Sequence, residues 1–379
     1  MVLEVRPMGV KCNLSCKYCY QHKYRRVGKE LTDYDLDIIT GYIKKRDQPV
    51  DIFGGEPLLI PIHDLEKLFG LAHEMHGYST IQTNGTLMND NHIKLFKKYN
   101  VYVGLSCDGP NELNNMRFAG SIDKTLQATK KTLDAMHQLR KNGLDTYFQV
   151  QLTKINATGT RLNKLMQWFK ELDDLGIKYC RIHVIDNNCL DSSLCLTEQE
   201  YIRAYSKLYE LQKTLVNLHF DIFDDMEKML QLKDDDVTCV FRGCDHYTTE
   251  AVMGINGNGE QHNCGAMDDE GVYFQKPDQK GYERAMMLYQ TPYEYGGCRG
   301  CRFFLACKGH CPGNAIDNDW RNRSVFCRVW QELFSLIEED LERKGITPVS
   351  RHPKRKEWED ILWSHWQRGV NLILEKDLN

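Results

Sequence analysis

The stretch LEVRPMGVKCNLSCKYC, residues 3–19, decides the fold, because it joins a short β-rich run to three closely spaced cysteines. The run over residues 3–7 predicts a first strand, and Cys12, Cys16 and Cys19 follow it in a loop. In parallel α/β proteins, binding sites form at the carboxyl ends of the strands. The end of this first strand is therefore expected to carry a metal or redox site.

Strands and helices continue to alternate beyond that stretch, up to about residue 218. The expected strands cover residues 3–7, 50–55, 79–85, 101–109, 145–153 and 178–185, and the expected helices cover 33–46, 62–76, 90–99, 121–142, 159–175 and 198–218. Thr197 and Glu200 form a capping box for the last helix. Strands that are each followed by a helix imply parallel pairing, which fits either a doubly wound sheet or an incomplete β/α barrel.

The overall composition is that of an ordinary globular protein. The 379 residues include 49 Lys and Arg against 53 Asp and Glu, so the net charge is −4. A domain that binds nucleic acid mainly through phosphates is usually strongly basic, which argues against that class. No apolar run approaches the ~18–20 residues that span a bilayer, and residues 1–16 lack an export pattern. We expect a cytoplasmic protein that binds neither nucleic acid nor membrane.

The cysteines are the unusual feature of the composition. Fifteen is a high number for a reducing compartment, where clustered cysteines more often bind metal or carry redox chemistry. Three thiolates without a nearby fourth leave one corner of a metal site open, which suits a [4Fe–4S] cluster that binds a small molecule directly. His22 could supply a fourth ligand, so the spacing alone leaves zinc open. Four scattered cysteines are expected to be small buried hydrophobes: Cys107, Cys180, Cys189 and Cys195.

The chain changes in character after about residue 225. Residues 239–327 are rich in Cys and Gly, and Asn256-Gly257-Asn258-Gly259 predicts the turn of a β-hairpin. A helix is expected over 327–345, ending at Gly345. The tail over 346–379 carries three tryptophans on one helical face and is expected to pack against the body. We therefore expect an α/β domain over 1–225, a cysteine-rich domain over 226–345 and a helical tail over 346–379.

The segment CNLSCKYC resembles the CxxxCxΦC signature of radical S-adenosylmethionine (SAM) enzymes, with Tyr18 at the aromatic position. Three further motifs follow at the ends of expected strands: GGEP at 54–57, TNG at 83–85 and SCDGP at 106–110. The resemblance implies that Cys12, Cys16 and Cys19 bind a SAM-holding [4Fe–4S] cluster, and it favours a partial (β/α)6 TIM-like barrel. It implies SAM contacts from Tyr18, Gly54, Gly55, Glu56, Asn84, Ser106, Arg117 and Gln151.

The chemistry of these residues suits such a ligand. Glu56 can pair with an ammonium group, Ser106 can donate to a carboxylate, and glycines let the backbone approach a ligand closely. Arg117 departs from the family pattern, because Asn114-Asn115 replaces the usual His-Asp and the spacing is one residue short. Gln151 on the fifth expected strand could reach the ribose or the adenine, or could be structural.

The later cysteines resemble the seven-cysteine SPASM extension of radical SAM enzymes, which binds two auxiliary [4Fe–4S] clusters. The resemblance assigns Cys298, Cys301, Cys307 and Cys327 to an outer cluster, and Cys244, Cys264 and Cys311 to an inner one. The inner set is one ligand short, and Cys239 is the candidate for the fourth position. If Cys239 is not a ligand, an open iron could bind a substrate thiolate. Without the resemblance, the same spacing also fits a zinc-stabilised module.

The function that the resemblance implies is peptide or protein modification. Such an enzyme cleaves SAM to a 5′-deoxyadenosyl radical, which abstracts a hydrogen atom from a peptide side chain or Cα. The expected product is a thioether or carbon–carbon crosslink, as in ribosomal-peptide maturases, or a related modification. The partners would be the peptide or protein and a reducing donor such as flavodoxin or ferredoxin.

Four other functions stay open: an anaerobic sulfatase maturase that makes formylglycine, a small-molecule dehydrogenase, an electron carrier and a zinc module. Sulfatase maturases carry an Asp after the second SPASM cysteine, whereas Gly265 follows Cys264 here. Many ribosomal-peptide maturases carry a recognition domain that the position of Cys12 leaves no room for. The non-enzymatic functions do not explain the ligand-type motifs. We assign no catalytic base among His262, His310, Asp268 and Tyr247.

Overall fold

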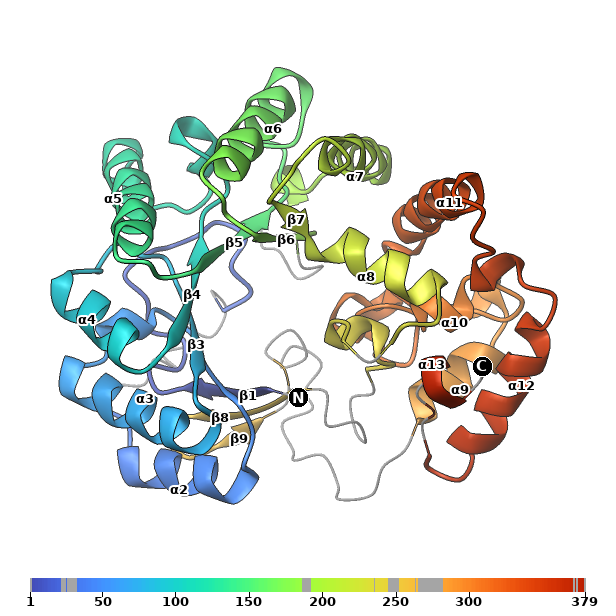
Figure 1. Cartoon of the computed structure of the whole chain (residues 1–379), viewed down its shortest axis with the longest axis horizontal. Helices are drawn as coiled ribbons and strands as arrows, with labels where there is room; N and C mark the ends of the chain where they lie inside the picture. The colour runs from blue at the N-terminus through green and yellow to red at the C-terminus, as the bar shows by residue number, and fades with distance from the viewer. Residues whose placement is uncertain are drawn as a thin grey trace. The chain divides into compact units, whose positions relative to one another are not determined.

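A computed structural model describes residues 2–21, 25, 33–185, 192–234, 236–244, 252–262, 264, 282–370, 372 and 374–377 (Figure 1). The chain forms two compact units. The sheet unit comprises Met1–Leu196, Glu210–Phe220 and Met253–His262, and the cysteine-rich unit comprises Thr197–Tyr209, Asp221–Val252 and Asn263–Asn379. None of the helices in the described part of the chain is long and apolar enough to cross a bilayer.

One sheet of nine strands organises the described part of the sheet unit. The parallel strands are β1 (Val2–Arg6), β2 (Val50–Ile52), β3 (Ser79–Thr83), β4 (Val101–Ser106), β5 (Thr146–Gln151), β6 (Tyr179–His183) and β7 (His219–Phe220). They lie side by side in chain order, and the order never reverses as it does in a doubly wound sheet. The sheet is not closed, so the partial barrel that the sequence favoured is confirmed.

Helices cover the outer face of this sheet (Figure 1). They are α2 (Leu36–Arg46), α3 (Ile62–His76), α4 (Asp90–Lys98), α5 (Ile122–Lys141) and α6 (Gly159–Asp174), and α7 (Glu198–Gln212) follows. Asp35, Asn89 and Ser121 cap the helices α2, α4 and α5, because each side chain accepts from an otherwise unpaired amide of the first turn. The expected capping box of α7 is confirmed, with Glu200 bonded to the Thr197 amide at 2.7 Å.

The strands present an apolar outer face and a polar inner face. Along β5, Phe148 and Val150 are fully buried against the helices, whereas Tyr147, Gln149 and Gln151 are only half-buried. This alternation follows from the two-residue period of a strand, because the helices cover one face of an open barrel. The polar inner face therefore stays accessible to a ligand.

The predicted hairpin is present, but it belongs to the sheet unit and not to the cysteine-rich domain where the sequence placed it. Its strands β8 (Val252–Asn256) and β9 (Gln261–His262) extend the sheet beside β1. The turn packs tightly on the first strand's exit, because a Cβ on Gly257 would lie 2.1 Å from the Pro7 carbonyl oxygen. The Asp35 amide also donates to the Gly257 carbonyl at 2.9 Å. These contacts between distant segments fix the hairpin at β1.

The cysteine-rich unit consists of short helices and turns. They are α8 (Asp221–Leu230), η4 (Cys239–Phe241), α9 (Glu283–Gln290), η6 (Tyr293–Tyr295), α10 (Phe304–Cys307), η7 (Pro312–Asn314), η8 (Ile316–Asn318), α11 (Cys327–Arg343), η9 (Val349–Arg351), α12 (Arg355–Trp366) and α13 (Leu374–Asp377). Helix α8 packs against α10 and α11. The expected helix from residue 327 is confirmed, and Gly345 follows it with a left-handed φ of 78°.

The tail helix α12 packs against α9, as the sequence predicted. Trp366 stacks on Tyr282 at 6.3 Å and meets Phe304 edge-on at 6.0 Å. Trp363 lies 5.7 Å from Tyr289. Trp366 therefore completes the core of the cysteine-rich unit.

Candidate functional site

The first candidate site is the loop over residues 12–19, which follows β1 and carries three cysteines. The Lys11 carbonyl accepts from the Glu56 amide at 2.9 Å, and the Ser15 amide donates to the Phe118 carbonyl at 2.7 Å. The loops after β2 and β4 therefore hold the cysteine loop from both sides.

Arg25 clamps the same loop, and the sequence analysis gave it no role. Its Nε donates to the Val10 carbonyl at 2.8 Å, one Nη donates to the Leu14 carbonyl at 3.4 Å, and the other lies 3.1 Å from the Cys19 sulfur. The guanidinium therefore ties the Cys19 side chain to the backbone of the same loop. No spacing rule points to Arg25, because it acts through tertiary contacts.

The protonation of these thiols fits a site that binds a metal group. Burial raises the pKa of Cys12 to about 11. Burial also raises the pKa of Cys16, and the neighbouring Cys19 and Cys12 raise it further, while Arg117 opposes them. Buried thiols that lie close together keep their protons unless a cation displaces them. A bound metal group supplies that positive charge. The donor set therefore fits an iron–sulfur cluster.

Gly54 and Gly55 permit the close approach between the GGEP loop and the cysteine loop. Their φ angles are 82° and 56°, in the left-handed region that favours glycine. A Cβ on Gly55 would lie 2.0 Å from the Lys11 carbonyl oxygen. The sequence predicts that these glycines admit a ligand, and the structure shows that Gly55 admits the backbone next to Cys12.

A Gly55→Ala variant should therefore lose the order of the cysteine loop. We expect at least a tenfold weaker SAM affinity and a lower iron content, because the new methyl group displaces Lys11. The matched control is Gly143→Ala, since Gly143 has a similar φ of 71° with no atom within 4 Å of its Cβ position. Both variants share the backbone strain of about 1–3 kcal/mol, so only the collision differs. Iron analysis and calorimetric SAM binding measure the difference, and equal behaviour of the two variants would contradict it.

Glu56 and Asn84 connect the loops after β2 and β3. The Glu56 carboxylate is only 1% exposed and accepts from the Thr83 hydroxyl at 2.5 Å and from the amides of Leu58 and Asn84 at 3.0 and 2.9 Å. Burial raises the pKa of Glu56, and these bonds oppose the rise. The Asn84 amide group donates to the Asn13 side chain at 2.8 Å. Both side chains thus position the site, and their direct contact with SAM stays a prediction.

Asp108 is the centre of a buried network that the sequence analysis quoted within a motif without giving it a role. Its carboxylate, which is fully buried, accepts from the Tyr18 hydroxyl at 2.5 Å and from the Gln151 amide at 3.0 Å. Arg117 donates to it through Nε at 3.1 Å and through one Nη at 2.9 Å. Three of the predicted SAM contacts, Tyr18, Arg117 and Gln151, therefore meet on one carboxylate.

Gln151 and Ser106 lie at the carboxyl ends of β5 and β4. The Ser106 hydroxyl accepts from the Gln82 amide group at 2.8 Å. In the described part of the chain, the side-chain oxygen of Gln151 is buried without a hydrogen-bond partner. Leaving such an acceptor unpaired costs about 1–3 kcal/mol, so a ligand donor is the expected occupant. The hydroxyl and amine donors of SAM fit that demand.

Replacing Gln151 should weaken SAM binding without removing iron. In Gln151→Leu we expect the SAM dissociation constant to rise about tenfold, because one buried hydrogen bond to the ligand is lost. Gln149→Leu makes the same change on the same face of β5, and its affinity should stay within twofold of wild type. Isothermal titration with the iron-loaded protein measures both. A Gln151→Leu protein that binds SAM as tightly as Gln149→Leu would rule out this contact.

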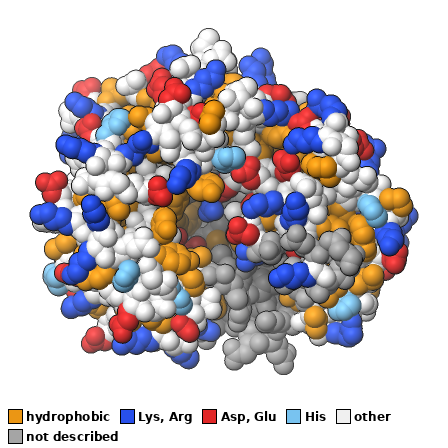
Figure 2. Space-filling view, viewed as in Figure 1, with side chains coloured by type: hydrophobic (Ala, Val, Ile, Leu, Met, Phe, Trp, Pro, Cys, Tyr) orange, Lys and Arg blue, Asp and Glu red, His pale blue; other side chains and the backbone are white. Residues whose placement is uncertain are grey.

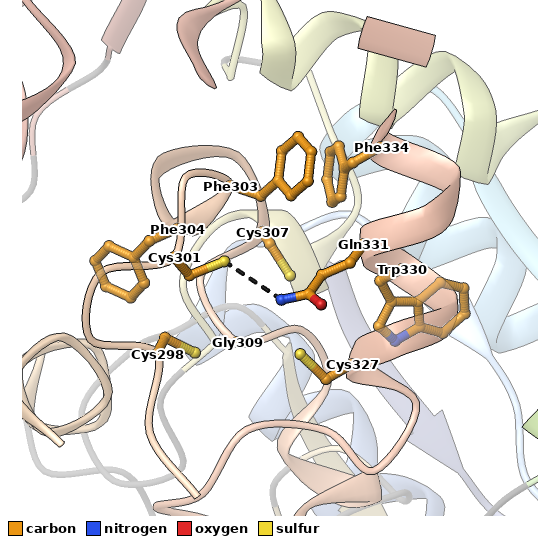
Figure 3. A pocket seen from close by; sticks show the side chains of 10 residues that line it. All are labelled: Cys298, Cys301, Phe303, Phe304, Cys307, Gly309, Cys327, Trp330, Gln331 and Phe334. Atoms are coloured by element: carbon orange, nitrogen blue, oxygen red, sulfur yellow. Dashed lines mark hydrogen bonds between the residues drawn. The ribbon is translucent and has the colours of Figure 1, made fainter. Parts of the chain in front are cut away.

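The second candidate site is a pocket in the cysteine-rich unit (Figure 3). The pocket is lined by Cys298, Cys301, Phe303, Phe304, Cys307, Gly309, Cys327, Trp330, Gln331 and Phe334. Burial raises the pKa of Cys298, Cys307 and Cys327, and the charges of the neighbouring cysteines add to the rise at each. The four thiols that the sequence assigned to the outer cluster therefore meet, and their chemistry fits a metal group.

The segments that carry Cys244 and Cys311 meet around Arg284, a fully buried arginine that the sequence analysis missed. One of its Nη atoms lies 3.4 Å from the Cys244 carbonyl and 2.9 Å from the His310 carbonyl. Its Nε donates to the Trp320 carbonyl at 2.7 Å. The guanidinium thus holds together two main-chain segments that carry predicted ligands of the inner cluster.

The ligand set of the inner cluster stays a prediction. Cys239 begins the turn η4, and Cys264 is described without its neighbours. Among the described residues, no three Cys, His, Asp or Glu donors surround one point at the spacing of ligands to a single ion. His310 stacks on Trp330 at 4.2 Å. His22, Cys189, Tyr247, Gly265, Asp268 and the side chain of His262 lie outside the described residues.

The scattered cysteines behave largely as expected. Cys107 and Cys180 are fully buried, which confirms their assignment as small core residues, whereas Cys195 is half-buried.

The chain is similar in sequence to known proteins. Residues 7–160 match the model of the Radical SAM superfamily. A cysteine-type anaerobic sulfatase-maturating enzyme of Clostridium perfringens is 23% identical over 371 residues, covering 88% of this chain and 95% of that enzyme. A serine-type anaerobic sulfatase-maturating enzyme of Bacteroides thetaiotaomicron is 25% identical over 353 residues, covering 83% of each.

Solved structures resemble this fold over most of the chain. Native anSMEcpe with bound AdoMet and a Cp18Cys peptide superposes with a TM-score of 0.68 at 20% identity, covering 90% of this chain and 98% of that one. Streptococcus suis SuiB bound to S-adenosylmethionine gives a TM-score of 0.61 at 18% identity, covering 86% and 77%. These similarities establish the fold.

Proposed function

We propose that this chain, which is a radical SAM enzyme, oxidises a side chain of a peptide or protein in the manner of the anaerobic sulfatase-maturating enzymes. One observation carries the proposal: the chain combines the three-cysteine loop after β1 with a separate four-cysteine pocket. Relatives of both the cysteine type and the serine type align with more than four-fifths of this chain. A peptide accompanies AdoMet in one structure of the same fold.

The cofactors of the enzyme are SAM and [4Fe–4S] clusters. When bound, they supply a 5′-deoxyadenosyl radical that takes a hydrogen atom from the substrate. Cys12, Cys16 and Cys19 would hold the cluster that binds SAM. Cys298, Cys301, Cys307 and Cys327 would hold one auxiliary cluster, and Cys244, Cys264 and Cys311, with Cys239 as the candidate fourth ligand, would hold a second.

The role of the protein's own residues is to bind SAM and to orient it. Asp108 holds the Tyr18 and Arg117 side chains and the Gln151 backbone in one buried network, so the loops after β1, β4 and β5 keep a fixed geometry. Glu56 fixes the Asn84 amide in the same way. Rigid placement of this kind lowers the entropic cost of bringing a ligand to its reacting position. The free acceptor of Gln151 would then orient SAM.

The sequence favours crosslinking over formylglycine formation, whereas the relatives favour formylglycine formation. The crosslink preference was based on Gly265, which follows Cys264 where sulfatase maturases carry an Asp. The names of the relatives support side-chain oxidation to formylglycine as the better alternative. Gly265 then means that a different residue removes the substrate proton. Crosslinking is kept as the second candidate because of that one difference.

The test compares three peptides that differ only in carrying Cys, Ser or Ala at one position. Each is incubated anaerobically with the iron-loaded enzyme, SAM and dithionite, which replaces a donor such as flavodoxin or ferredoxin. We expect an aldehyde product, captured by a hydrazide reagent, from the Cys or Ser peptide and none from the Ala peptide. Loss of two hydrogen atoms without aldehyde capture would support the crosslink. If no peptide changed while SAM was cleaved, peptide modification would be excluded.

A further inference from the structure

Helix α11 presents two polar groups to the pocket of Cys298, Cys301, Cys307 and Cys327. Cys327 begins the helix, and Gln331 lies four residues later, so both side chains lie on one face of the helix. The Gln331 amide nitrogen donates to the Cys301 sulfur at 3.6 Å (Figure 3). A ligand-type cysteine and a hydrogen-bond donor to another such cysteine therefore come from adjacent turns.

The surroundings of Gln331 are otherwise apolar. Phe303 stacks on Phe334 at 5.4 Å, and both rings line the pocket together with Trp330. Figure 3 shows the Gln331 side chain reaching from the helix toward the Cys301 sulfur. An amide in such a position gains little from apolar packing, so its value lies in the bond to sulfur.

The bond from the Gln331 amide is made to Cys301, one of the four cysteines that line the pocket. Hydrogen bonds to cluster sulfurs favour the more negative, reduced form and raise the reduction potential. Apolar walls strengthen this effect, because the local dielectric constant is low.

We propose that Gln331 sets the reduction potential of the auxiliary cluster held by these four cysteines, by donating a hydrogen bond to the Cys301 sulfur. The inference rests on the proposed function, since it requires a cluster in this pocket. Gln331 is a positioning residue here, because it acts through the sulfur of Cys301. Replacing Gln331 should therefore change neither the cysteine ligands of this cluster nor the fold.

The test is a redox titration of the iron-loaded full chain, monitored by electron paramagnetic resonance. In Gln331→Leu we expect the reduced fraction of the outer auxiliary cluster, at a fixed potential near its midpoint, to fall about tenfold relative to the oxidised fraction. Tenfold corresponds to about 59 mV for a one-electron couple. The signals of the other clusters should keep their midpoints, and the iron content should equal that of wild type.

Two further variants separate the hydrogen bond from packing. Gln331→His keeps an N–H donor and should restore most of the potential, whereas Gln331→Glu accepts only and should lower it at least as far as Leu. Glu332→Gln changes the neighbouring exposed side chain of the same helix and should leave the midpoint unchanged. If Gln331→Leu fails to load iron, the His and Glu variants decide the matter. Equal midpoints for wild type, Leu and Glu would overturn the proposal.

The failure of this inference can be distinguished from the failure of the proposed function. A Cys301→Ala variant with the iron content and spectrum of wild type would show that the pocket holds no cluster, and the proposed function would lose its auxiliary site. A loaded cluster whose potential ignores Gln331 would remove only the present proposal.

Discussion

A Cys16→Ala variant is expected to form no detectable 5′-deoxyadenosine when it is incubated anaerobically with SAM and dithionite. Cys16 is the middle cysteine of the loop over residues 12–19, and burial raises the pKa of its thiol. Removing it leaves two thiolates of three, which cannot hold a [4Fe–4S] cluster with a single open iron. Chromatography of the reaction mixture measures the nucleoside directly.

The matched control for this variant is Cys180→Ala. Cys180 is fully buried on β6 and belongs to neither cysteine group, so its replacement should leave 5′-deoxyadenosine formation near the wild-type rate. Wild-type product formation by Cys16→Ala would show that the loop does not hold the catalytic cluster.

An Asp108→Asn variant is expected to lose both stability and SAM binding. The substitution keeps the shape of the side chain but leaves the Arg117 guanidinium buried, at 8% exposure, without its carboxylate. Breaking a buried ion pair by removing one partner costs about 3–5 kcal/mol, a large fraction of the roughly 5–15 kcal/mol that stabilise a folded protein. Urea unfolding followed by circular dichroism should show a clearly lower midpoint.

The double variant Asp108→Asn/Arg117→Gln distinguishes loss of the charge pair from general damage. It removes both charges, so the stranded cation is gone and the unfolding midpoint should recover part of the loss. If the double variant is less stable than Asp108→Asn alone, the charge pair is not what holds this network, and the account of Asp108 as its centre fails.

The local pattern of the sequence predicts the elements of the sheet unit closely. Helix α3 occupies residues 62–76 as predicted, and β5 lies inside the expected run because its apolar and polar residues alternate. Such patterns reflect burial on one face, which each segment carries in its own residues. The strand β7 has only two residues and is too short to show a period. Helix α8 does show a helical period, with Ile222, Phe223, Met226, Met229 and Leu230 buried, and the sequence-based prediction missed it.

The sequence did not predict which residues from distant segments contact one another. The Asn-Gly turn predicted a hairpin, but its place beside β1 comes from contacts between distant segments, such as those of Gly257 with Pro7 and Asp35. Likewise the motifs placed Glu56 and Asn84 at strand ends, whereas their mutual bond appears only in the folded chain. Asp108, Arg25 and Arg284 act through several backbone segments at once, and no spacing in the sequence marks such residues.

The central claim is that Cys12, Cys16 and Cys19 would each hold one iron of a [4Fe–4S] cluster and leave the fourth iron open for SAM. The most direct measurement is electron–nuclear double resonance of the reduced wild-type protein with SAM that carries 15N in its amine or 17O in its carboxylate. The account predicts magnetic coupling of both labels to the cluster. A fully iron-loaded protein that shows no coupling to either label, or anaerobically purified protein that contains zinc in place of iron, would contradict it.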